Sequence, residues 1–102
     1  MANYEKSEEA LLDWREIIEY TINRFGEQQA LKYSASLITC IESMTSGNQY
    51  FKVIDVNGRK VGVKHCHKHY IFALIRENRP LLVFAIFHER MDLMVRLKNR
   101  LN

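Results

Sequence analysis

The sequence has little of what marks disordered, fibrous or disulfide-rich chains. Its 102 residues include one proline, four glycines and two cysteines, which excludes collagen-like and low-complexity chains and a fold held by several disulfides. Cys40 and Cys66 form no CxxC pair, and we expect both to be free thiols in a reduced cytosol. With 47% hydrophobic and 26% charged residues, the chain has the composition of one globular domain spanning residues 1–102.

Long hydrophobic runs are also absent. The longest uncharged apolar segments, Tyr70–Ile75 and Pro80–Phe87, fall far short of the ~20 residues that a membrane helix needs. The N-terminus has no apolar segment of the kind found in secretory signals. These absences predict a cytoplasmic protein that makes no contact with a membrane.

Charge is divided unevenly along the chain. The first 50 residues contain four Lys or Arg and eight Asp or Glu, whereas the remaining residues contain eleven and four. The two halves therefore carry net charges of −4 and +7. This asymmetry indicates two surfaces with different partners. An equally good explanation is that the basic side chains only keep the surface of the sheet and of the C-terminal tail in contact with water.

Two helices are predicted in the first half. Ser7 is a suitable N-cap before the acidic residues Glu8 and Glu9, and Gly26 is a suitable helix end. At helical spacing, the first helix carries Leu11, Trp14, Ile18, Ile22 and Phe25. The second carries Ala30, Tyr33, Leu37, Ile41 and Met44, widened by Leu31 and Ile38, and is expected to stop at residues 46–48. Because the connection between them is so short, the helices should form an antiparallel hairpin.

Two apolar residues lie outside the expected face of the first helix. At 100° per residue, Leu12 lies about 100° and Tyr20 about 180° from Leu11. Scattered apolar residues are normal on protein surfaces. The alternative hypothesis is that Leu12 and Tyr20 form a docking site for another chain.

The pattern changes to strands in the second half. Residues 60–65 alternate with period two, as in a half-buried strand. The apolar runs in 69–76 and 81–88, joined by a turn at 77–80, are typical of a central antiparallel hairpin covered on both faces. Asn57-Gly58 favours a type I′ turn, which would make Phe51–Val56 a further strand.

A last helix is predicted from about Met91. Leu93, Met94, Leu97 and Leu101 share one face, and Arg96 and Arg100 lie on another. Isolated helices this short are marginal in water. The helix should therefore dock on its own domain or on a partner.

Two local clusters contain residue types that are suited to metal binding or to catalysis. Zn²⁺ accepts His and Cys ligands, but residues 65–69 lack a second ligand pair at zinc-finger spacing, so no metal or other cofactor is predicted. His88, Glu89 and Arg90 could serve phosphodiester chemistry as acid, base and phosphate ligand. Three consecutive residues of a strand should not all face one pocket, and capping or solvation explains them equally well.

The order of elements and several motifs together resemble a known family. The motifs are KHYIF at 68–72, VFAIFHERMDLM at 83–94 and, in the first half, Asp13-Trp14, Tyr20-Thr21 and FGEQQA at 25–30. They are similar to the ParE branch of the RelE/ParE toxins of bacterial type II toxin–antitoxin systems, and most similar to the plasmid-borne members that poison DNA gyrase. The resemblance covers nearly the whole chain, and the stretch at 87–101 is its most specific part.

The expected fold is α+β, with an N-terminal antiparallel helical hairpin on a three- or four-stranded antiparallel sheet and a short C-terminal helix. The resemblance adds a short edge strand around residues 3–6 and implies that 51–56 is irregular. It also implies a non-enzymatic inhibitor of DNA gyrase that serves plasmid maintenance and is neutralised by a ParD-type antitoxin. A homodimer within a toxin–antitoxin hetero-oligomer is expected, with operator DNA bound only through the antitoxin.

The same family contains a rival function, because RelE-type relatives are ribosome-dependent mRNA endonucleases. These commonly use an aromatic residue near the C-terminus, and this chain has none after Phe87. Their charge-stabilising residues are matched only partly, by Lys64, Lys68 and Arg76. No catalytic residue is therefore predicted. The candidates for gyrase binding are Lys68, Tyr70, Arg76, His88, Arg90, Arg96 and Arg100, and those for antitoxin binding are Leu12 and Tyr20.

Overall fold

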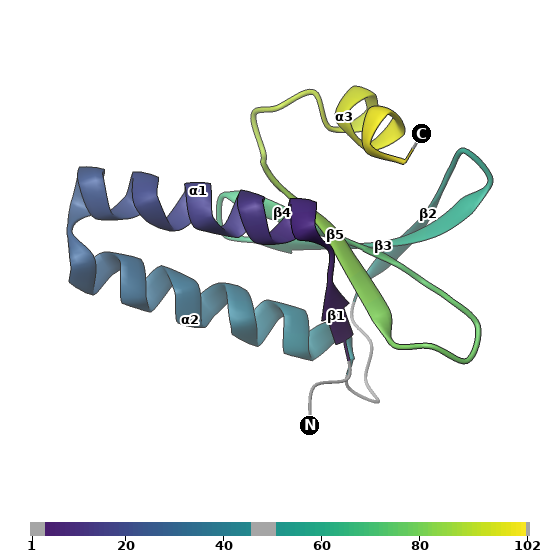
Figure 1. Ribbon diagram of the computed structural model, residues 1–102, viewed down its shortest axis with the longest axis horizontal. Coiled ribbons are helices and arrows are strands. Elements are labelled where there is room, and N and C mark those ends of the chain that lie inside the picture. Colours follow the sequence, from purple (N-terminus) through teal and green to yellow (C-terminus); the bar gives the residue numbers. More distant parts are fainter. Residues whose placement is uncertain (1–3, 46–50, 102) are drawn as a thin grey trace.

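The computed structural model describes residues 4–45 and 51–101, and their elements follow the predicted order (Figure 1). In chain order the elements are β1 (Tyr4–Lys6), α1 (Glu8–Phe25), α2 (Glu27–Met44), β2 (Lys52–Val56), β3 (Arg59–Cys66), β4 (His69–Leu74), β5 (Leu81–His88) and α3 (Leu93–Arg100). The α+β class, the helical hairpin and the short C-terminal helix are confirmed. None of the described helices is long and apolar enough to cross a membrane.

The sheet is larger than expected, with five strands in the order β1-β5-β4-β3-β2. β1 is the short N-terminal edge strand that the resemblance implied, and it pairs with β5 in parallel, while all other pairs are antiparallel. β2 is a regular strand, so the implied irregular segment was wrong. Asn57 and Gly58 both have positive φ (53° and 79°), as a type I′ turn requires, and this turn sets the register of β2 on β3.

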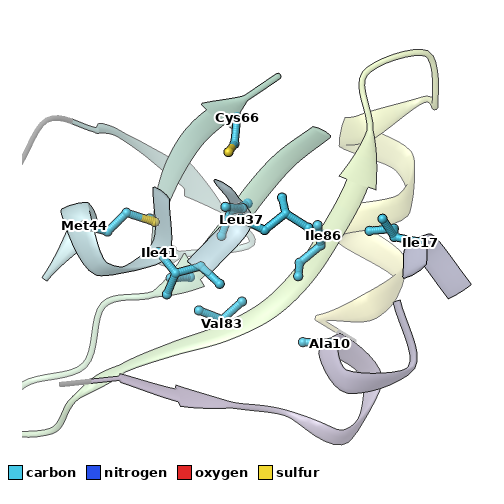
Figure 2. Packing of buried hydrophobic residues seen from close by; sticks show 10 residues of the cluster. Ala10, Ile17, Leu37, Ile41, Met44, Cys66, Val83 and Ile86 are labelled. Atoms are coloured by element: carbon cyan, nitrogen blue, oxygen red, sulfur yellow. The ribbon is translucent and has the colours of Figure 1, made fainter. Parts of the chain in front are cut away.

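The sheet separates two hydrophobic cores. The α1–α2 hairpin covers one face (Figure 1), where Leu37, Ile41 and Met44 of α2 lie against Val83 and Ile86 of β5 (Figure 2). α3 covers part of the other face through Leu97, which packs with side chains of β2 to β5. The two central strands β4 and β5 are therefore buried on both sides, as their continuous apolar runs predicted.

β5 contains a β-bulge that directs neighbouring side chains into both cores. Phe72 pairs with Ala85 and Ala73 pairs with Val83, so Phe84 has no partner on β4. Such a bulge changes which face the following side chains occupy. Val83 and Ile86 belong to the core under the hairpin, while Phe84, Ala85 and Phe87 belong to the core under α3.

The buried face of α1 differs from the predicted one. The N-cap is confirmed, because the Ser7 hydroxyl accepts from the backbone N–H of Ala10 at 3.1 Å, and Gly26 ends the helix with φ 91°. The buried residues, however, are Ala10, Ile17 and Thr21. The small side chains of Ala10 and Thr21 let the helix approach the sheet closely. The buried hydroxyl of Thr21 donates to the backbone carbonyl of Ile17 at 2.7 Å. Leu11, Ile22 and Phe25, which were expected in the core, are exposed.

The other helices follow their predicted faces more closely. In α2 the main stripe is buried or half-buried, but Leu31 and Ile38 are exposed. α2 ends at Met44, and residues 46–48, where a stop was expected, lie outside the described residues. In α3 the leucines face the sheet, whereas Met94, expected beside them, is 44% exposed.

The cysteines overturn the expectation of free thiols. Cys40 of α2 and Cys66 of β3 are joined in a disulfide across the layer between hairpin and sheet. Neither sequence spacing nor composition reveals such a pair, because the two residues meet only when α2 packs on the sheet. Cys66 is buried at the end of β3 (Figure 2), next to the turn that leads into β4.

Candidate partner-binding groove

A groove of about 1260 Å³ runs between α1 and the segment that leads from β5 into α3. Its lining comes from α1, from α2, from the β3–β4 turn, from the end of β5 and from α3. We call this feature the α1–α3 groove. It exists because α1 crosses β5 while α3 returns to the opposite face of the same strand (Figure 1).

The two walls of the groove carry opposite net charges. On the α1 side lie three carboxylates and one cation, together with the apolar side chains of Leu12 and Tyr20; the charged residues are Glu9, Asp13, Glu16 and Arg24. The facing wall carries one carboxylate, Glu89, and four cations, namely Lys68, Arg90, Arg96 and Arg100. The acidic first half of the chain therefore supplies one wall of the groove and the basic second half supplies the other. Apolar side chains add contact area to the groove.

Arg100 lines the groove and is bound by the rest of the protein. Its guanidinium makes two contacts with the carboxylate of Asp13, at 2.5 and 3.2 Å, and also donates to the carbonyl of Phe84 at 3.1 Å. The side chains of Arg100 and Asp13 are only 20% and 13% exposed. The backbone N–H of Ile86 donates to the same carboxylate at 3.0 Å. Arg100 is thus engaged inside the protein, with its charge balanced by Asp13.

A tyrosine and a histidine meet in the part of the groove next to the β3–β4 turn. The hydroxyl of Tyr33 lies 2.5 Å from Nδ1 of His69. Burial lowers the pKa of His69 to about 4, helped by the nearby His88, while Glu89 acts in the opposite direction. Burial also raises the pKa of Tyr33. Near neutral pH a protonated Tyr33 hydroxyl therefore lies against a neutral His69, and the tautomer of the imidazole determines which of the two donates.

The consecutive residues His88, Glu89 and Arg90 all line the groove, contrary to the expectation for three residues of one strand. The physical reason is that β5 ends at His88, so that Glu89 and Arg90 lie in the following turn. They do not converge on one point, because Glu89 Oε2 lies 3.3 Å from Nε2 of His65, and His88 Nδ1 accepts from the backbone N–H of Arg90 at 3.1 Å.

The structure brings most of the candidate binding residues together. Leu12 and Tyr20, 53% and 59% exposed, line the same groove as five of the cationic or histidine candidates, namely Lys68, His88, Arg90, Arg96 and Arg100. Two candidates lie elsewhere. Arg76 donates to Glu5 at 2.6 Å and to the carbonyl of Pro80 at 2.7 Å, and Tyr70 lies on the sheet face that carries α3.

Sequence reasoning missed Asp13, Tyr33 and His69 as groove residues. Asp13 had a detectable signal, because it lies within about 60° of Ala10 and Ile17 on the helix, and a carboxylate on a buried face needs a partner. The contact between Tyr33 and His69 had no such signal, since it depends on how α2 packs against the β3–β4 turn. Within residues 4–45 and 51–101, no three His, Cys, Asp or Glu side chains are arranged to hold a metal ion.

Comparisons with known proteins agree on one family. A family model described as ParE toxin of the type II toxin–antitoxin system parDE matches residues 4–93. The chain is 41% identical over 101 residues to Toxin ParE of Escherichia coli, covering 99% of this chain and 98% of that relative. A solved structure described as the chromosomal ParDE TA system from P. aeruginosa has a TM-score of 0.68 at 14% identity, covering 83% of this chain and 92% of that one. At this low identity the structural likeness concerns the fold.

Proposed function

The chain belongs to the ParE toxin family of type II toxin–antitoxin systems, and we propose that it blocks DNA replication by binding and inhibiting DNA gyrase. It acts in the cytoplasm, serves plasmid maintenance and catalyses no reaction of its own. The observation that carries the proposal is the α1–α3 groove, which combines exposed apolar side chains with opposite net charges on its two walls. Such a surface suits a protein partner, because apolar area supplies affinity and charge supplies orientation.

The state of the polar groups supports binding rather than catalysis. A catalytic acid or base must reach the reacting atoms of a substrate. Here the carboxylate of Asp13, 13% exposed, is held by Arg100 and by the backbone N–H of Ile86. The absence of an aromatic residue after Phe87 further separates the chain from the mRNA endonucleases that it resembles.

We place the antitoxin in the same groove. A ParD-type antitoxin would lay a segment that is disordered in the free state over α1, with apolar residues against Leu12 and Tyr20. That segment would also cover Lys68 and Arg90 on the facing wall, so neutralisation follows from occlusion. The toxin forms a homodimer within the toxin–antitoxin hetero-oligomer, and operator DNA is bound through the antitoxin.

The experiment that tests this function compares two activities of the purified toxin. It should inhibit supercoiling by DNA gyrase and trap cleaved DNA, and addition of antitoxin should restore supercoiling. In parallel, the toxin is added to ribosomes that are translating a defined mRNA. The mRNA should remain uncut. Cleavage of the mRNA with normal supercoiling would instead assign the chain to the endonuclease function.

A further inference from the structure

A row of aromatic rings crosses three strands on the sheet face that carries α3. His65, Tyr70 and Phe87 are direct cross-strand neighbours in β3, β4 and β5, so their side chains share one face. The rings of His65 and Tyr70 are stacked, with centroids 4.4 Å apart and planes inclined by 14°. Phe87 is buried under the guanidinium of Arg100, 4.8 Å from its ring centroid.

The row is covered at one end and open at the other. Phe87 belongs to the core that α3 closes, and Tyr70 is half-buried beside it. The side chain of His65 is 50% exposed. The sheet therefore presents to solvent an aromatic ring that is already held flat against a second ring.

Two cations lie next to this open end. Lys68 is in the turn that joins β3 to β4, and Arg90 follows the end of β5. The backbone N–H of Glu89 donates to the carbonyl of Lys68 at 2.9 Å, which holds the two segments together. Both cationic side chains are exposed, and no ion pair found among the described residues includes either of them. The nearby carboxylate of Glu89 is engaged by His65.

We propose that the His65–Tyr70 stack, with Lys68 and Arg90, binds single-stranded nucleic acid. One base extends the stack at His65, and the flanking phosphates lie at the two cations. Stacking on a ring accepts any base, because every base has a π-face, so recognition is independent of sequence. In a duplex the base faces are already stacked on one another, and the site therefore prefers single strands. The site overlaps the α1–α3 groove at Lys68 and Arg90, whereas His65 and Tyr70 lie outside the groove lining, so substitutions at His65 test the stack without changing the groove.

Fluorescence anisotropy with labelled oligonucleotides tests the proposal on the purified toxin. The probes are oligothymidine and oligouridine of ~10 nucleotides, a length within the range of known single-strand sites, and a DNA duplex of equal length. Both single strands should bind more tightly than the duplex, and the better of the two identifies DNA or RNA as the ligand. Two phosphate contacts predict that affinity falls about sevenfold between ~50 and ~200 mM salt.

Matched variants separate stacking from charge. His65→Phe keeps a ring and His65→Ala removes it, while both lose the contact with Glu89. The alanine variant should therefore bind ~5–150-fold more weakly than the phenylalanine variant. Lys68→Ala with Arg90→Ala should flatten the salt dependence, whereas Lys60→Ala with Arg79→Ala, at the other end of the strands, should not.

Three outcomes would overturn the proposal. The first is no binding of either single strand at ~0.1 mM toxin, the weak limit of non-specific nucleic-acid affinity. The second is equal affinity for the duplex, and the third is equal affinity of the two His65 variants. Each of them leaves inhibition of gyrase as a separate question, because the assay contains no gyrase.

Discussion

The guanidinium of Arg100, in the last turn of α3, is bound by the carboxylate of Asp13, which lies 87 residues earlier in α1. The same carboxylate accepts from the backbone N–H of Ile86 in β5. One acidic side chain thus joins the helical hairpin, the central sheet and the C-terminal helix. The basic residues of α3 therefore have different roles, because Arg96 is exposed whereas Arg100 is largely enclosed.

Removing this ion pair should destabilise the fold. Arg100→Ala leaves the Asp13 carboxylate without its charged partner, and we expect the free energy of unfolding to fall by ~1.5–3 kcal/mol. Arg96→Ala, on an exposed part of the same helix, should change it by no more than ~0.5 kcal/mol. Urea unfolding of the two variants measures the difference. Equal stability of the two would show that the contact with Asp13 contributes nothing.

The disulfide between Cys40 and Cys66 should contribute measurably to stability. It spans 26 residues of sequence, and the loop-entropy model assigns a crosslink of this length ~3–4 kcal/mol. Addition of dithiothreitol should therefore lower the midpoint of thermal unfolding. The variant with Cys40→Ala and Cys66→Ala should unfold at a lower temperature and be insensitive to reductant. An oxidised protein with the same midpoint as the reduced one would contradict this prediction.

How well the fold was predicted depended on the range of the interactions. Ser7, Gly26 and the Asn57-Gly58 turn act on their immediate neighbours, and each was identified from the sequence. The disulfide was not, because its two cysteines approach only through the packing of α2 on β3. The buried face of α1 was misassigned because large side chains such as Leu11 and Phe25 outweighed Ala10 and Thr21, whose small size fits the surface of β5.

The groove, too, could be predicted from the sequence only where local patterns determine it. Leu12 and Tyr20 were identified because they lie off an apolar stripe, and Lys68 and Arg90 because basic residues gather in the second half. Their location in one groove depends on the crossing of α1 over β5, which no local pattern encodes. Arg100 was expected to face a partner, yet it contacts Asp13, because the position of a long side chain depends on which carboxylate the fold brings within reach.

Stability should depend on the protonation of His69. Burial lowers its pKa from 6.5 to about 4, so the unfolded chain binds a proton more readily than the folded one. The stability from keeping His69 neutral is complete above pH ~6.5 and is lost as pH falls toward ~4. Unfolding midpoints measured across this interval should fall less steeply in His69→Asn than in the unmodified protein. Equal slopes for His69→Asn and the unmodified protein would refute the role of His69.

The apolar wall of the groove should determine antitoxin affinity. Leu12→Glu with Tyr20→Glu places two charges where an apolar segment would lie, and binding of a ParD-type antitoxin should weaken by at least ~10-fold, since each lost apolar side chain is worth ~1.5–3 kcal/mol. Leu31→Glu is a suitable control, because Leu31 is 72% exposed on α2 and outside the groove lining. Isothermal titration calorimetry on folded variants measures both. Equal affinities would place the antitoxin on another surface.

Inhibition of gyrase by groove variants tests the central claim most directly. Lys68→Ala with Arg90→Ala removes two exposed cations from the groove, and Lys60→Ala with Arg79→Ala removes two exposed cations outside it. If the groove is the surface that binds gyrase, the first variant should need at least ~10-fold more protein for half-inhibition of supercoiling, with an unchanged unfolding midpoint, because close charge pairs across an interface are worth ~1.5 kcal/mol or more. The second variant should inhibit like the unmodified toxin. Full inhibition by the first variant would contradict the account.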